Sequence, residues 1–128
     1  MSFRALVVDD SATMRNMVKR MVGRTNLGEF QFTEAEDGQA ALAKFDSLTT
    51  DIVFIDWNMP NMTGLEFAKR IRALGGRRVL IVMVTTEGTA ARRQEASEQA
   101  GVDAYVIKPF TVEDMACALR PILGRQAA

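Results

Sequence analysis

The chain contains no histidine and a single cysteine, Cys117, among its 128 residues. Without histidine, Ser-His and Cys-His catalysis and imidazole-bound metals are all excluded. One cysteine forms neither an internal disulfide nor a cysteine-built zinc site, so we expect a reducing, cytoplasmic compartment. Any chemistry at a site in this chain is therefore expected to rest on carboxylates, hydroxyls and amines.

Neither sign of charge is in excess, because 16 Lys and Arg residues balance 16 Asp and Glu residues without a long run of either. A non-specific nucleic-acid binder would show a basic excess, and a surface membrane anchor would show a polybasic segment. The apolar stretch within residues 1–10 is too short for a signal peptide or a membrane span. The length and the apolar content of 48% suit one compact, soluble domain.

Short runs rich in β-branched residues predict the strands of a sheet. Four of them are continuously apolar, which is typical of strands buried on both faces of a parallel sheet. A weaker fifth run, Phe30–Ala35, alternates and is expected at an edge. The four continuous runs are Ala5–Val8, Ile52–Ile55, Val79–Val84 and Ala104–Ile107.

Five segments with helical spacing of their apolar residues follow these strands in turn. The fourth of them has alanine as its only apolar residue, so we expect it to bury little and to be the loosest helix. The five segments are Met14–Val22, Asp37–Ser47, Thr63–Leu74, Thr89–Ala100 and Val112–Leu123.

This alternation of strand and helix, repeated five times, predicts an α/β fold with a parallel sheet, helices on both faces and right-handed crossovers. In such folds ligands bind beyond the carboxyl ends of the strands. The residues that follow each strand are therefore the first candidates for a functional site.

Polar side chains follow four of the predicted strands. Asp9 and Asp10 end the first, Asp56 the third, Thr85 the fourth and Lys108 the fifth. Each also has an ordinary structural interpretation. These are helix caps (Asp10 or Ser11, and Thr86 or Thr89), the start of a turn (Asp56) and a surface lysine (Lys108).

Taken together, these side chains favour a site for phosphoryl chemistry. Three carboxylates that converge without a cation raise one another's cost of ionisation. A hard divalent cation relieves that cost, and Mg²⁺ prefers a few carboxylates together with waters and phosphate oxygens. The hydroxyl of Thr85 and the ammonium of Lys108 can then hold a phosphoryl group delivered to Asp56. A carboxylate nucleophile that forms an aspartyl-phosphate is established chemistry.

Five motifs in order, LVVDDSATMR, EAEDG, DWNMPNMTGLE, MVTTEG and YVIKPF, resemble those of response-regulator receiver domains. The resemblance runs nearly end to end and is strongest to the stand-alone receivers of chemotaxis. It implies a doubly wound (βα)5, flavodoxin-like three-layer sandwich with a five-stranded parallel sheet of order 2-1-3-4-5. It also implies one receiver domain over residues 1–128, with no output domain.

The resemblance further implies a role for each acidic residue of the site. Asp56 resembles the phosphoacceptor of the family. Asp10, Asp56 and the backbone carbonyl of Asn58 resemble the Mg²⁺ ligands, and Asp9 is expected to act through water. We expect Trp57 to be partly exposed near this metal.

Other residues match the parts of the family that respond to phosphorylation. Thr85 resembles the switch hydroxyl, and Tyr105 the aromatic residue whose rotamer follows it. Lys108 resembles the phosphate-pairing lysine, and in the family the Lys108–Pro109 peptide is cis. Glu87 and Asn58 are expected to line the path of the attacking water.

The function implied is that of a phosphoacceptor signalling domain rather than a true enzyme. Its implied partners are a histidine kinase and a downstream protein such as a flagellar motor switch component, and we expect a monomer. A phosphorelay shuttle outside chemotaxis is the main alternative. A phosphatase of the haloacid dehalogenase kind would carry D-x-D after its first strand, and an FMN binder would not place Asp9 and Asp10 beside a phosphate. A receiver-shaped interaction module that is never phosphorylated is a further alternative, and the intact set of Asp9, Asp10, Asp56, Thr85 and Lys108 argues against it.

Overall fold

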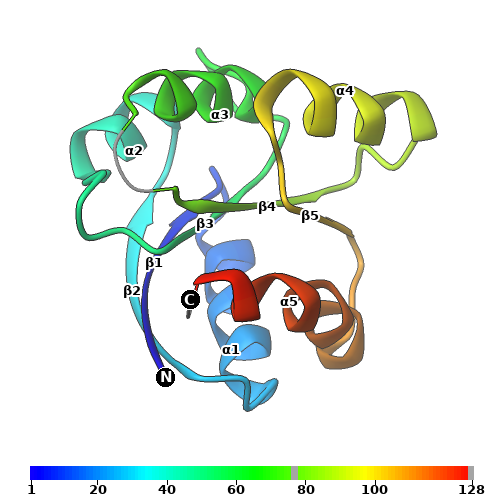
Figure 1. Ribbon diagram of the computed structural model, residues 1–128. Helices are drawn as coiled ribbons and strands as arrows, with labels where there is room; N and C mark the ends of the chain where they lie inside the picture. Colours follow the sequence, from blue (N-terminus) through cyan, green and yellow to red (C-terminus); the bar gives the residue numbers. More distant parts are fainter. Residues whose placement is uncertain (76–77, 127–128) are drawn as a thin grey trace.

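The computed structural model describes residues 1–75 and 78–126, in which five strands alternate with five helices (Figure 1). The elements are β1 (Ser2–Val8), α1 (Ala12–Arg24), β2 (Glu29–Ala35), α2 (Gly38–Lys44), β3 (Ile52–Ile55), α3 (Gly64–Ala73), β4 (Leu80–Thr85), α4 (Ala90–Ala100), β5 (Ala104–Ile107) and α5 (Val112–Gln126).

The strands form one parallel sheet of order β2-β1-β3-β4-β5. Helices α1 and α5 cover one face, and α2, α3 and α4 cover the other, which gives three layers (Figure 1). The predicted doubly wound (βα)5, flavodoxin-like fold is therefore confirmed. None of the helices in the described ranges is both long and apolar enough to cross a bilayer.

The burial of the strands agrees with their places in the sheet. Every residue of β3 and β4 is buried, so these strands lie in the middle of the sheet with an apolar cluster on each face. Along β2, exposed and partly buried residues alternate, as expected for an edge strand. Because the sheet is parallel, the carboxyl ends of β1, β3, β4 and β5 meet at one edge.

Most predicted boundaries are shifted by one to three residues, and two of these shifts have a clear physical reason. Helix α2 ends at Lys44 rather than at Ser47, because Phe45 leaves the helix with extended backbone and packs against the core. Strand β4 runs from Leu80 to Thr85 rather than from Val79 to Val84, since Thr85 still pairs with Ile107 of β5. Thr85 is thus the last residue of a buried strand and not a loop residue.

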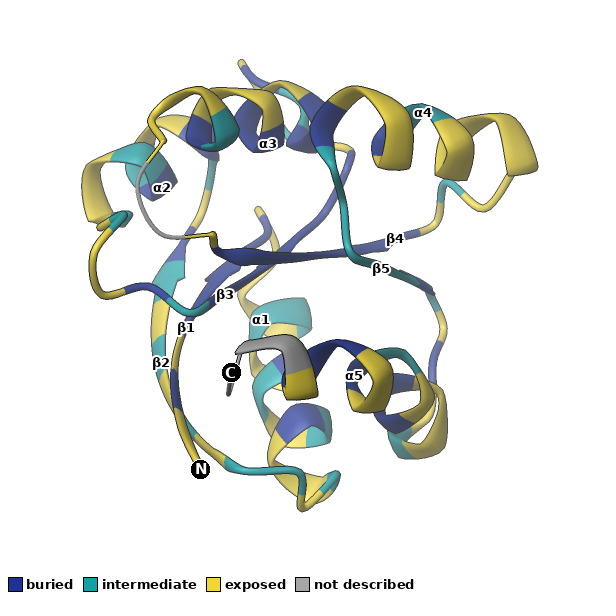
Figure 2. Ribbon diagram, in the orientation of Figure 1, coloured by how far each residue is buried: buried dark blue, intermediate teal, exposed yellow. Residues whose placement is uncertain are grey.

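The expectation that α4 buries little is confirmed, because its buried residues are Ala96 and Ala100 (Figure 2). Its carboxyl end is held by Arg72, whose guanidinium donates hydrogen bonds to the carbonyl oxygens of Ala100 and Gly101 at 3.2 and 2.8 Å. Both buried alanines lie in the second half of the helix. The first half of α4 therefore contributes little to the apolar core.

Each of the five helices is preceded by a residue whose side chain accepts a hydrogen bond from a backbone N–H in the first turn, and these residues are Ser11, Asp37, Thr63, Thr89 and Thr111. The ordinary interpretations are thereby confirmed for Ser11 and Thr89. Asp10 does not cap α1, because Ser11 is the residue that does.

Candidate functional site

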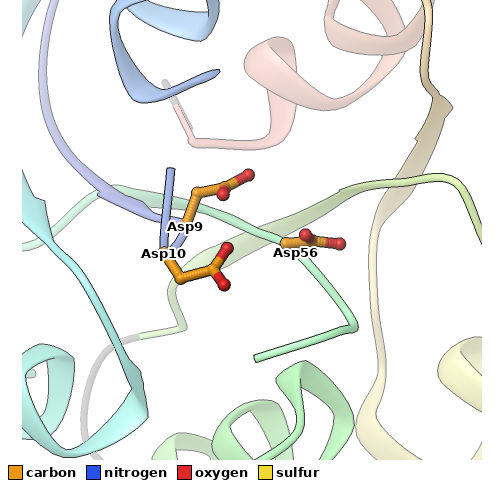
Figure 3. A group of neighbouring side chains, drawn as sticks. All are labelled: Asp9, Asp10 and Asp56. Atoms are coloured by element: carbon orange, nitrogen blue, oxygen red, sulfur yellow. The ribbon is translucent and has the colours of Figure 1, made fainter. Parts of the chain in front are cut away.

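Asp9, Asp10 and Asp56 converge at the carboxyl edge of the sheet (Figure 3). One oxygen from each carboxylate lies within 4.8 Å of the others, with Asp9 and Asp56 buried and Asp10 exposed. The sheet itself brings them together, since β1 and β3 are neighbours in register and the Asp56 N–H donates to the Val8 carbonyl at 3.2 Å. Three hard oxygen donors at this spacing suit a divalent cation.

Lys108 supplies a positive charge to this cluster. Its Nζ lies 2.9 Å from Asp9 Oδ2 and 3.2 Å from Asp56 Oδ2. Burial alone would lower the pKa of Lys108, but the hydrogen bond to Asp9 and the charges of Asp56 and Asp9 outweigh it, so the pKa is raised. The ammonium is therefore charged at neutral pH, yet one cation does not balance three carboxylates. The donor set fits Mg²⁺, whose two charges would make up the difference.

The second oxygens of the two buried carboxylates are oriented by the backbone. Asp9 Oδ1 accepts a hydrogen bond from the Ser11 N–H at 2.9 Å, and Asp56 Oδ1 accepts one from the Asn58 N–H at 3.3 Å. Each carboxylate is thus held between a backbone N–H and the ammonium of Lys108. Such two-sided contacts restrict rotation, which positions Asp56 for chemistry at its oxygens.

Gly64 allows the loop after Asp56 to fold closely onto α3. A Cβ atom at this position would collide with the carbonyl oxygen of Asp56. The Gly64 N–H also donates to the Trp57 carbonyl at 2.8 Å. A residue without a side chain is therefore required where the first turn of α3 meets the strand end.

Thr85 and Tyr105 both contact Glu87. Thr85 is fully buried, and its Oγ1 accepts a hydrogen bond from the Glu87 N–H at 3.3 Å. The half-buried Tyr105 donates its hydroxyl to the Glu87 carbonyl. Burial and the charge of Glu87 raise the pKa of Tyr105, so its hydroxyl stays protonated and able to donate. The two residues thus meet at one backbone position of the β4–α4 loop.

The expectation that Trp57 is partly exposed is wrong, because the residue is only 5% exposed. Its ring joins the apolar cluster that includes Met62 and Leu65 on the α3 side of the sheet. The guanidinium of Arg92 covers it at 5.0 Å from the ring centroid. Arg92 comes from α4, a region whose sequence gives no indication of this contact.

A model of the response regulator receiver domain matches residues 5–120 of the chain. The chain belongs to this family. The receiver is 42% identical over 123 residues to Chemotaxis protein CheY1 of Helicobacter pylori (strain J99), a match that covers 94% of this chain and 97% of that protein. It is also 42% identical over 126 residues to the chemotaxis protein CheY homolog of Campylobacter jejuni, covering 94% and 92%.

Solved structures agree with this assignment. The structure of chemotaxis protein CheY4 of Vibrio cholerae superposes on this receiver with a TM-score of 0.81 at 32% identity, covering 95% of this chain and 99% of that one. A receiver domain of Clostridium thermocellum, at 20% identity and a TM-score of 0.83, shows the fold alone; it covers 98% of this chain and 97% of that one.

The receiver brings together every expected side chain of the acidic site, namely Asp9, Asp10, Asp56 and Lys108. The Lys108–Pro109 peptide is cis, as the resemblance implied. The contacts of Glu87 with Asn58 and of Arg92 with Trp57 had not been predicted. Both contacts depend on the path of the β4–α4 loop, and the spacing of apolar residues predicts strands and helices but not the path of a loop.

Proposed function

We propose that this receiver accepts a phosphoryl group from a histidine kinase on Asp56 and thereby changes its affinity for a partner protein. The observation that carries the proposal is the contact of Lys108 with both Asp9 and Asp56 inside the three-carboxylate cluster. Asp10, Asp56 and the backbone carbonyl of Asn58 would hold Mg²⁺, with Asp9 acting through water. When bound, Mg²⁺ offsets the negative charge of the phosphoryl oxygens and the carboxylates.

The transfer step needs positioning more than it needs a base. A carboxylate oxygen of Asp56 attacks phosphorus as the bond from phosphorus to the donor's imidazole nitrogen breaks, and the released imidazole keeps that electron pair. A carboxylate nucleophile attacks as an anion, so this step requires no general base. The ammonium of Lys108, now beside Asp9 and Asp56, is placed to hold an oxygen of the transferred group.

Thr85 and Tyr105 would convert this local event into a change of surface. The phosphoryl oxygens are new acceptors, and the Thr85 hydroxyl, whose oxygen accepts a hydrogen bond from the Glu87 N–H in this structure, would donate to them. When the Thr85 side chain turns towards Asp56, the Glu87 N–H in the β4–α4 loop loses its hydrogen-bond acceptor. Because the Tyr105 hydroxyl is hydrogen-bonded to the carbonyl of the same residue, the movement of Glu87 would reach the surface formed by α4, β5 and α5.

Chemotaxis is the process we propose for this receiver, because the relatives that match it over nearly their whole length are named as chemotaxis proteins. The downstream partner would then be a protein such as a component of the flagellar motor switch, met in the cytoplasm. In this role the chain acts as a phosphoacceptor whose own site promotes transfer and hydrolysis, and it does not turn over a separate substrate.

The proposal is tested by intact-mass measurement after incubation with acetyl phosphate and Mg²⁺. The wild-type chain should gain one phosphoryl mass, and Asp56→Asn should gain none. Asp46→Asn, which changes an exposed carboxylate in the loop after α2, is the matched control and should label like wild type. Stable labelling of Asp56→Asn at full stoichiometry would show that another residue is the phosphoacceptor.

A further inference from the structure

Arg92 contacts two residues next to the phosphorylation site from the first turn of α4. Its guanidinium lies over the ring of Trp57, the residue that follows Asp56, at 5.0 Å from the centroid. Its Nε lies 4.0 Å from Glu87 Oε2. A guanidinium at such a distance from an indole face is attracted by the negative charge of the ring face.

Glu87 in turn reaches across to the loop that carries Asp56. Its Oε1 accepts a hydrogen bond from Asn58 Nδ2 at 3.2 Å, a contact that we call the Asn58–Glu87 bridge. This bridge joins the loops after β3 and β4, which are neighbouring strands. It therefore lies on the side of the site that faces β4, two residues after Asp56 in the chain.

The Asn58–Glu87 bridge is a solvent-accessible hydrogen bond and is therefore weak on its own. Asn58 is exposed, and the Glu87 side chain retains 36% of its surface, so water competes for both partners. Arg92 is anchored more firmly, since Trp57 lies on one side and Glu95 Oε1 lies 3.1 Å from its Nη1. The arginine thus restricts where the carboxylate of Glu87 can lie.

We propose that Arg92 is a positioning residue for the reaction at Asp56, acting through Glu87 to keep the Asn58–Glu87 bridge closed and water out. The inference rests on the function proposed above. In hydrolysis a water oxygen forms a bond to phosphorus, the bond from phosphorus to the Asp56 oxygen breaks, and inorganic phosphate leaves while a proton passes to solvent. A bridge that is loosened on the β4 side admits this water more readily.

The expected effect is moderate, because the Arg92 side chain is 46% exposed and the contacts are screened by solvent. Losing one exposed ion pair and one cation–π contact should change the hydrolysis rate about two- to fivefold. Arg92→Gln removes the charge and should accelerate hydrolysis by this factor. Arg92→Lys keeps a cation for Trp57 and Glu87 and should restore most of the wild-type lifetime.

Two further variants separate positioning from a general effect of charge. Glu98→Gln removes an exposed carboxylate further along α4, where it accepts a hydrogen bond from Gln94, and leaves Arg92, Trp57 and Glu87 in place, so it should hydrolyse like wild type. Glu87→Ala removes the bridge itself and should accelerate hydrolysis at least as much as Arg92→Gln. In the Glu87→Ala background, Arg92→Gln should add nothing, because the residue through which it acts is gone.

The experiment labels each variant with acetyl phosphate and Mg²⁺, removes the donor and follows the loss of the phosphoryl mass with time. A thermal unfolding midpoint close to that of wild type checks that each variant is folded. Equal lifetimes for wild type and Arg92→Gln, or additive effects of Arg92→Gln and Glu87→Ala, would overturn the inference while leaving the phosphoacceptor assignment intact. A wild-type chain that takes up no phosphoryl group would overturn the proposed function and this inference with it.

Discussion

Thr85 and Tyr105 are joined through the backbone of one residue, Glu87, which donates its N–H to the Thr85 hydroxyl and accepts from the Tyr105 hydroxyl. The two side chains belong to neighbouring strands, yet each is tied to the same loop position. A rotation of the Thr85 side chain that breaks its hydrogen bond with the Glu87 N–H would therefore loosen the residue whose carbonyl holds the Tyr105 hydroxyl. This shared residue gives the proposed switch a physical connection between the phosphorylation site and β5.

The first prediction follows from this connection. Thr85→Ala should still accept a phosphoryl group, because Asp56 and Lys108 are untouched, but the response of α4 and β5 should be much smaller than in wild type. Amide chemical shifts of residues 90–107, recorded with and without acetyl phosphate and Mg²⁺, measure that response. Thr85→Ser keeps the hydroxyl and is the matched control. Full switching by the alanine variant would mean that the threonine does not transmit the signal.

The second prediction concerns Mg²⁺ binding without phosphate. The three carboxylates need a counter-ion even at rest, so Mg²⁺ should bind the unphosphorylated chain and change the fluorescence of Trp57, the single tryptophan, which adjoins Asp56. Asp10→Ala should weaken binding by about tenfold or more, since even indirect partners of a metal are worth that much. Glu98→Ala, on the exposed side of α4, should bind like wild type. Unchanged affinity in Asp10→Ala would place the metal elsewhere.

Most of the fold was predictable, because buried strands appear in the sequence as short runs of apolar residues. The run Ile52–Ile55 matches β3 residue for residue, since a strand buried on both faces needs uninterrupted apolar residues. The run Ala104–Ile107 also matches β5 residue for residue, but only Val106 of this edge strand is buried, so its continuous apolar pattern did not indicate burial on both faces. The end of α2 was not predictable, because Phe45 is compatible with the helical pattern and leaves it only to pack against the core. The strand order itself came from the family resemblance and not from any periodicity.

The site was predictable to a similar extent and for a related reason. Asp9, Asp56 and Lys108 follow strands directly, so their meeting at one edge follows from the parallel sheet. Trp57 was misplaced because a residue after a strand end has no periodic partner that tells which way it points. The contact between Arg92 and Glu87 depends on the path of a loop, which no strand or helix pattern contains.

The third prediction concerns the pH dependence of stability. Hydrogen bonds from Lys19 and Arg15, at 2.8 and 3.0 Å, lower the pKa of Glu34 below its usual value of 4.5. A lowered pKa in the folded state stabilises the protein above the unfolded value, and this contribution is lost as the pH falls through the folded pKa. Because Glu34 is partly exposed, Glu34→Gln should lower the free energy of unfolding at pH 7 by only about 0.5–1 kcal/mol.

Urea unfolding of both proteins at pH 7 and at lower pH tests this expectation. The difference between Glu34→Gln and wild type should shrink as the pH falls below 4.5, since the wild-type carboxylate is then neutralised as well. Glu36→Gln, an exposed neighbour in the loop after β2, should show little difference at either pH. A difference for Glu34→Gln that stays constant with pH would mean that packing, and not charge, accounts for it.

The last prediction compares two glycines. Gly64→Ala should lower the free energy of unfolding by about 1–3 kcal/mol, because its Cβ would push against the backbone carbonyl of Asp56, which cannot move aside like a flexible side chain. The same push displaces the phosphoacceptor, so labelling by acetyl phosphate should also slow. Gly23→Ala, inside α1 with no atom within 4 Å of the added Cβ, should instead stabilise the chain by about 0.5–1 kcal/mol. Denaturant unfolding and labelling rates of both variants measure these effects. If Gly64→Ala matched wild type in stability and labelling, the close packing of α3 against Asp56 would not be what positions the carboxylate.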